Sequence, residues 1–356
     1  MSPAPRVLVT TAAIGAGHDL PAELLAAAVR ERGGEARVVD LLAETGRVVH
    51  SLVTSSASGP GFDASYWLTQ RRAGVALLEW FTWTVGRRPA LRMVDAFAPD
   101  VVVSTYPGFN PTLARLHREG TMPAPLVSAI TDLAALRYWA EPDIALHLIT
   151  HAESALEVRA RAGPETSIVQ VSGFSDPAFL EPAETGEARA ALALPGSGSV
   201  CVVSGGGWGV GDLEGAVRVA LEVPGMTVVC LCGTNDELRA RLADVFAGSP
   251  GVQVWGFTDR MSDLLAAADV LVHSTAGLTV LEAQIRGTRV ISYGWGRGHI
   301  RANNRAYERL GLAAVARSPH ELRQALRAAL ASPRAPDDAL RTLPAAADVV
   351  LGLVGR

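Results

Sequence analysis

Short apolar runs alternate with amphipathic, helix-like segments along most of this chain of 356 residues. Each run has the length of a strand buried on both faces, and most end in a turn of small or polar residues. Strands that alternate with helices in this way are typical of parallel sheets. We therefore predict an α/β fold. The expected strands are residues 6–11, 35–41, 100–104, 125–131, 145–150, 168–171, 200–204, 227–232, 252–255, 270–273 and 289–293.

The pattern restarts once, after a stretch rich in Pro, Gly and small residues at 172–187. The length of the chain also favours two domains. We predict domains at 1–172 and 188–335, joined by a linker at 173–187. Residues 336–356 should be helical, broken at Pro344, and packed back on the first domain. Residues 44–65 are rich in Ser, Gly and Pro and predict a loop, and residues 66–97 predict an aromatic helix.

Residues 270–282 indicate most clearly what kind of ligand the chain binds. The apolar run at 270–273 stops in the turn Ser274-Thr275-Ala276-Gly277, and a helix is expected from about Leu278, with Glu282 in its second turn. A helix that begins at the carboxyl end of a strand offers free N–H groups and a positive dipole end to an anion. Glu282 is placed to accept hydrogen bonds from ribose hydroxyls. The segment therefore predicts a nucleoside diphosphate site, followed after the strand at 289–293 by a Gly-rich loop with His299, Asn303 and Asn304.

Several further motifs occur in a fixed order along almost the whole chain. They are Gly15-Ala16-Gly17-His18, Ser104-Thr105-Tyr106-Pro107, Thr131-Asp132, Gly205-Gly206-Gly207, Cys232-Gly233-Thr234-Asn235, Gly256-Phe257 with Met261, and Gly277-Leu278-Thr279 through Glu282-Ala283. In this order they resemble glycosyltransferases of the GT-B fold. The family concerned contains monogalactosyldiacylglycerol synthases, processive diacylglycerol glucosyltransferases and the GlcNAc transferase that completes lipid II.

The resemblance implies two doubly wound, Rossmann-like domains facing a central cleft. The second would hold a UDP-sugar as co-substrate and the first a lipid or apolar small-molecule acceptor, with inversion at the anomeric carbon. Neither a metal nor another cofactor is implied, because helix N-termini and backbone amides balance the diphosphate charge. The donor-binding residues implied are Gly206, Gly207, Gly256, Phe257, Met261, Ser274, Thr275, Ala276, Gly277, Leu278, Thr279, Glu282, His299 and Asn303.

The catalytic residues implied are His18 and Asp132. His18 would take the proton from the acceptor hydroxyl, because an imidazole titrates near neutral pH. It would otherwise be a loop residue that caps the next helix. Asp132 would orient His18 or act as the base itself, and otherwise would be the N-cap of a helix starting at Leu133.

The donor residues also have plainer interpretations. Glu282 would then be a surface residue, Phe257 part of a core, and His299 and Asn303 loop or capping residues. The loop at 205–211 would resemble a dinucleotide fingerprint, but it lacks the G-x-G-x-x-G spacing. Where the family has Gln and a carboxylate, this chain has His299 and Ile300, so the donor sugar stays open.

Composition indicates which classes of partner the protein binds and in which cellular compartment it is expected. A net charge of −4 gives no support for nucleic-acid binding. Three Cys in apolar runs, with no signal peptide or long apolar span, favour a reduced, cytoplasmic protein. The aromatic segment from Tyr66 to Trp83 has Arg around it, which suits peripheral contact with the inner face of a membrane, but such rings more often pack in a core or line an acceptor pocket.

Two other functions remain open on the sequence. One is a UDP-GlcNAc 2-epimerase-like enzyme, which shares the fold and needs no acceptor. The other is a non-catalytic homologue that serves as a partner protein, which the changes at His299 and Ile300 motivate.

Overall fold

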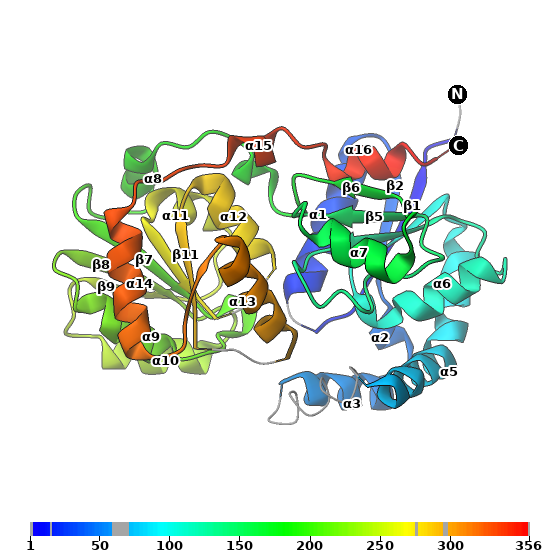
Figure 1. Ribbon diagram of the computed structural model, residues 1–356, viewed down its shortest axis with the longest axis horizontal. Coiled ribbons are helices and arrows are strands. Elements are labelled where there is room, and N and C mark those ends of the chain that lie inside the picture. Colours follow the sequence, from blue (N-terminus) through cyan, green and yellow to red (C-terminus); the bar gives the residue numbers. More distant parts are fainter. Residues whose placement is uncertain (1–2, 15, 59–70, 275–276, 295–297, 355–356) are drawn as a thin grey trace. The chain divides into compact units, whose positions relative to one another are not determined.

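The computed structural model describes residues 3–14, 16–58, 71–274, 277–294 and 298–354 (Figure 1). The chain forms two compact units. The first comprises residues 1–175 and 342–356, and the second comprises residues 176–341. In the described part of the chain, no helix has both the length and the apolarity that crossing a membrane requires.

The first unit contains a six-stranded sheet whose order is β2-β1-β3-β4-β5-β6, and each neighbouring pair is parallel. Its central strands are buried on both faces, as expected for a parallel sheet covered by helices. The order changes direction between β1 and β3. The strands are β1 (Arg6–Thr11), β2 (Glu35–Asp40), β3 (Val101–Ser104), β4 (Leu126–Ile130), β5 (Leu146–Ile149) and β6 (Ile168–Gln170).

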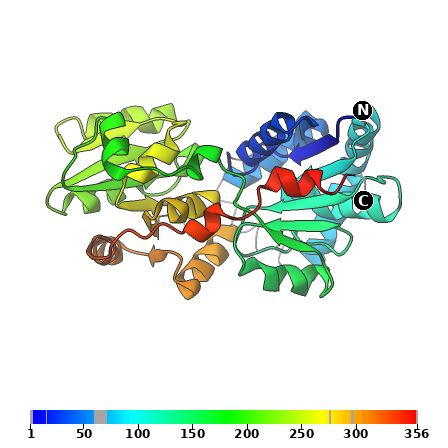
Figure 2. The ribbon, with the colours of Figure 1, turned by 90° about the horizontal axis from the view of Figure 1, so that it is seen from above.

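Helices cover this first sheet, and the chain returns to it at its end. In Figure 2, α16 lies beside α1, and the guanidinium of Arg32, the residue directly after α1, contacts the Asp348 carboxylate of α16. A break at Pro344 separates α15 from α16, as predicted. The helices of this unit are α1 (Ala16–Glu31), α2 (Leu41–Glu44), α3 (Arg47–Ser58), α5 (Arg72–Phe97), α6 (Asn110–Arg118), α7 (Ser154–Ala162) and α16 (Ala346–Leu351), with the 3-10 turn η1 (Pro107–Phe109).

The second unit contains another six-stranded parallel sheet, with the order β12-β11-β10-β7-β8-β9. Taken in chain order, this is the doubly wound arrangement of dinucleotide-binding domains, and it changes direction between β7 and β10. The strands are β7 (Ser199–Ser204), β8 (Met226–Leu231), β9 (Val252–Trp255), β10 (Val270–His273), β11 (Arg289–Tyr293) and β12 (Ala314–Ala316).

Helices α9 and α10 pack on one face of the second sheet, in a core to which no described residue of α11 or α12 belongs. The last long helix, α14, returns to the face of α9. The helices of this unit are α8 (Thr185–Ala191), α9 (Leu213–Leu221), α10 (Asp236–Val245), α11 (Met261–Ala267), α12 (Leu278–Arg286), α13 (Gly298–Leu310), α14 (Pro319–Ala331) and α15 (Asp338–Arg341), with the 3-10 turns η2 (Pro177–Phe179) and η3 (Gly206–Trp208).

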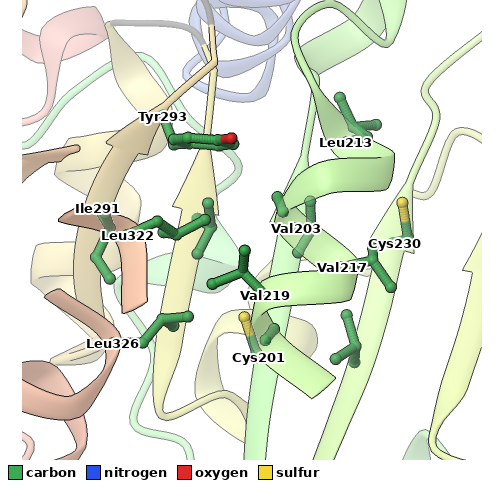
Figure 3. Close-up of a cluster of buried hydrophobic side chains, with 14 of the residues drawn as sticks. Cys201, Val203, Leu213, Val217, Val219, Cys230, Ile291, Tyr293, Leu322 and Leu326 are labelled. Carbon is green, nitrogen blue, oxygen red and sulfur yellow. The ribbon is translucent and has the colours of Figure 1, made fainter. Parts of the chain in front are cut away.

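The core beneath α9 and α14 is made of side chains that alternate along the strands. Figure 3 shows Val203, Ile291 and Tyr293 from the strands packed against Val217 and Leu322 from the helices. The residues that lie between these positions in the strands point to the opposite face. Ser204, His273 and Ser292 are three of them, and they occupy one row across β7, β10 and β11.

Two predicted loops are wrong. Within 44–65, residues 47–58 form α3, because Val49 and Val53 pack on the core of the first unit. The Gly-rich loop expected around Asn303 and Asn304 is the helix α13, whose buried side packs on the sheet. The pattern also predicted neither β12 nor α14.

Candidate active site

The predicted base lies where the first sheet changes direction. His18 lies in the first turn of α1, which follows β1, and Thr105 directly follows β3. The His18 Nδ1 is 2.9 Å from the Thr105 carbonyl oxygen. Since a carbonyl oxygen can only accept, Nδ1 carries the hydrogen and Nε2 carries the lone pair that takes up a proton. The Thr105 hydroxyl donates to the His18 carbonyl oxygen at 3.0 Å, so the two residues hold each other in place.

Asp132 lies near the same edge of the sheet, after the end of β4. Its carboxylate accepts a hydrogen bond from the Trp139 indole at 3.1 Å, and the residue is 9% exposed. The Trp139 ring centroid lies 5.9 Å from that of His18. No helix begins at Leu133, so the N-cap interpretation of Asp132 is wrong. Trp139 contacts both predicted catalytic residues.

The Gly-rich loop of the second unit begins at the carboxyl end of β7 and contains Gly206 and Gly207 in η3. Backbone crowding explains its composition. A Cβ at Gly209 would lie 2.6 Å from the Cys232 carbonyl oxygen, and one at Gly211 would lie 2.1 Å from the Ser274 hydroxyl. The loop therefore packs directly against the end of β10, at the point where the sheet changes direction.

Helix α12 begins at this point, as predicted. Its N-cap, Gly277, has a φ of 88°, which favours glycine, and its N–H donates to the Tyr307 hydroxyl at 3.2 Å. Ser274 donates its hydroxyl to the Tyr293 carbonyl oxygen at 2.8 Å. Thr275 and Ala276 lie outside the described residues.

Leu278 and Thr279 form the first turn of α12 and are partly buried. Glu282 follows in the second turn and is only 8% exposed. The interpretation of Glu282 as an ordinary surface residue is therefore wrong. A carboxylate this deeply buried costs free energy unless it has partners.

The remaining predicted donor residues are spread over two places. Gly256, Phe257 and Met261 follow the edge strand β9, and Phe257 is 61% exposed, so it does not belong to a core. Asn303 is fully buried on α13. His299 contributes backbone to the first turn of α13, and its side chain lies outside the described residues.

Comparisons with known proteins show which families this chain resembles. Residues 18–175 match the family model of monogalactosyldiacylglycerol synthase, and residues 214–332 match that of glycosyl transferases group 1. The chain is also 22% identical, over 334 residues, to a processive diacylglycerol β-glucosyltransferase of Bacillus mycoides, covering 89% of this chain and 84% of that one. This chain is a glycosyltransferase of the GT-B fold.

Solved structures support the fold of this glycosyltransferase. Acinetobacter baumannii MurG superposes with a TM-score of 0.61 at 16% identity, covering 99% of each chain. The glycosyltransferase SnogD from Streptomyces nogalater superposes with a TM-score of 0.57 at 19% identity and the same coverage. The predicted α/β class and the predicted family resemblance are confirmed.

Two features near the candidate site residues were missed from sequence. The first is Thr105, whose carbonyl oxygen orients His18. Its position directly after β3 could have indicated this role, but only once β3 is known to neighbour β1. The second is His273, which lies between Ser204 and Ser292 at the carboxyl ends of three adjacent strands. Burial lowers the pKa of His273 to about 4, so this imidazole is neutral. Within the described part of the chain, neither of its ring nitrogens has a hydrogen-bond partner.

Proposed function

We propose that this glycosyltransferase moves a sugar from a UDP-sugar to a hydroxyl group of a lipid acceptor of the diacylglycerol type, with inversion and without a metal. One observation carries the donor half of the proposal: a helix N-terminus and a buried carboxylate, Glu282, stand together where a doubly wound sheet changes direction. Ligands of such sheets bind outside the carboxyl ends of the strands at this point.

The donor would be held mainly by backbone groups. The first N–H groups of α12 and the loop at Gly206 and Gly207 would face the diphosphate, where the helix dipole favours negative charge. Glu282 would accept hydrogen bonds from the ribose, and the exposed Phe257 ring would stack on uracil. His299 and Asn303 remain our candidates for the sugar hydroxyls.

The acceptor would be activated by His18. Its Nε2 takes the proton of the acceptor hydroxyl while that oxygen attacks the anomeric carbon from the face opposite UDP. The bond from the anomeric carbon to the UDP oxygen breaks, and UDP leaves with the electron pair. The hydrogen bond to Thr105 fixes the tautomer that this step needs. Asp132 would stabilise the imidazolium that forms.

Exposed apolar side chains on the first unit support a lipid acceptor. On α3, Val48 is 82% and Leu52 is 60% exposed, and on α5, Leu77 is 56% and Trp80 is 63% exposed. Arg115 stacks its guanidinium 3.8 Å from the centroid of the Trp83 ring. Of the predicted membrane-facing segment, Tyr66 and Trp67 lie outside the described residues. Apolar side chains beside cations suit a membrane interface, and the Bacillus mycoides relative is named as a processive diacylglycerol β-glucosyltransferase.

Thermal unfolding with UDP tests the donor proposal. At concentrations about a hundredfold above the dissociation constant, a ligand of the native state adds about 3 kcal/mol of stability, which raises Tm by several degrees. Glu282→Ala should abolish most of this rise, and the exposed Glu237→Ala on α10 should keep it. If millimolar UDP leaves the Tm of the wild-type protein unchanged, the donor proposal fails.

A further inference from the structure

A tyrosine outside every motif described above contacts the start of α12. The Tyr307 hydroxyl accepts the Gly277 N–H at 3.2 Å, across thirty positions of the chain, and the Tyr307 side chain is fully buried. Tyr307 belongs to the third turn of α13. The N-cap of one helix is therefore held by a side chain of the next.

A second hydrogen bond fixes the helix that carries Tyr307. The Ser292 hydroxyl, near the end of β11, donates to the Asn304 side-chain oxygen at 2.9 Å, and both residues are buried. Asn304 precedes Tyr307 by three positions, so the two side chains leave the same face of α13. That face is thus tied both to the sheet and to the start of α12.

The tie to Gly277 determines which N–H groups α12 offers to a ligand. The first N–H groups of a helix have no partner within the helix. The Tyr307 hydroxyl takes the N–H of Gly277, a residue that has a positive φ of 88°. The N–H groups of Leu278 and Thr279, in the first turn of the helix, then remain to bind the proposed diphosphate.

We propose that Tyr307 is a positioning residue for the diphosphate of the donor, acting through Gly277. The inference rests on the proposed donor site. It concerns the diphosphate alone, because Tyr307 contacts Gly277, at the helix N-terminus that would face the phosphates. The residues proposed for the ribose and uracil, Glu282 and Phe257, lie at other positions.

The test compares Tyr307→Phe with the wild-type protein, using UDP and uridine as probes and measuring both dissociation constants by calorimetry or ligand-observed NMR. Loss of the buried hydrogen bond to Gly277 should weaken UDP binding about tenfold, and uridine binding should stay within about twofold. A general loss of structure would weaken both probes together. Equal losses, no change in either, or tighter UDP binding would each overturn the proposal; the last would mean that the hydroxyl competes with phosphate.

Thr288→Val is the matched control. The buried Thr288 hydroxyl donates to the Leu265 carbonyl oxygen at 2.5 Å, at the opposite end of α12, so this change removes a comparable hydrogen bond far from Gly277. The ratio of the UDP and uridine constants should keep its wild-type value in this variant, and a change like that of Tyr307→Phe would contradict the proposal.

If Tyr307→Phe does not fold, Ser292→Ala provides the test. It removes the hydrogen bond between Ser292 and Asn304 that holds α13, and it leaves Tyr307 unchanged. It should lower the preference for UDP over uridine by about two- to fivefold, and an unchanged preference would overturn the proposal. Failure of the wild-type protein to bind UDP would instead reject the donor site itself, which separates the two proposals.

Discussion

Two histidines at strand or helix ends show how differently the fold treats one residue type. His18 is partly buried and has its Nδ1 fixed by a backbone carbonyl, which leaves Nε2 as the proton acceptor. His273 is 1% exposed, and burial lowers its pKa to about 4. The first arrangement is the one that the proposed general base requires, whereas the second keeps a neutral ring beneath the proposed donor site.

The lowered pKa of His273 predicts a dependence of stability on pH. In the unfolded chain this imidazole titrates near its ordinary value of 6.5, and in the folded protein it titrates near 4. Between these values the unfolded state binds more protons, so the stabilisation is present above about pH 6.5 and is lost as the pH falls toward 4. The loss attributable to this residue is at most about 3 kcal/mol.

Denaturant unfolding at several pH values between 4 and 7 measures this effect. His273→Leu should flatten the fall in the free energy of unfolding over that range, and the exposed His320→Leu on α14 should not. Parallel curves for His273→Leu and the wild-type protein would show that the buried imidazole is not responsible.

At the scale of elements, strands were easier to predict than helices. Buried parallel strands are continuous apolar runs, so β1, β9, β10 and β11 match their predicted bounds. Helix α3 was missed because its Ser residues favour loops locally, while its stability comes from Val49 and Val53 packing on residues distant in the chain. The loop expected near Asn303 was wrong for a similar reason: α13 is held by Ser292 and Gly277.

Helix α12 is fixed at its far end as well. The Arg334 guanidinium donates to the Arg286 carbonyl oxygen at 2.8 Å, and the Arg341 guanidinium donates to that of Ile285 at 3.1 Å. Cations at a helix C-terminus satisfy its last carbonyl groups and favour its dipole. The element with the proposed diphosphate site is therefore held at both ends.

Helices α3 and α5 allow a test of the proposed lipid surface. Replacing Leu77 and Trp80 together by Ser should reduce binding to phosphatidylcholine vesicles that contain diacylglycerol by at least about tenfold, because each apolar side chain contributes on the order of 1.5 kcal/mol or more when buried. Vesicle co-sedimentation measures this. Leu156→Ser on α7 is the control, since Leu156 is 77% exposed on another helix. Equal binding by the double variant and the control would argue against this surface.

At the scale of the whole molecule, the order of the strands in each sheet could not be predicted from local sequence patterns. The contact between His18 and Thr105 depends on β1 and β3 being neighbours, and the packing of Gly211 on Ser274 depends on β7 and β10 being neighbours. In the first unit His18 lies where the strand order changes direction, and in the second unit Ser274 and Gly277 do, whereas Phe257 and Met261 follow the edge strand β9. The catalytic and the diphosphate-binding predictions thus reach the same kind of place in two separate sheets, from motifs far apart in the chain.

The most direct test is a sugar-transfer assay with labelled UDP-glucose, UDP-galactose and UDP-GlcNAc, diacylglycerol in vesicles, and EDTA in the buffer. We expect labelled glycolipid and released UDP from at least one donor with the wild-type protein. His18→Gln should lower the rate by about a hundredfold or more while its affinity for UDP stays unchanged. No product from any of the three donors, or an undiminished rate in His18→Gln, would contradict this account.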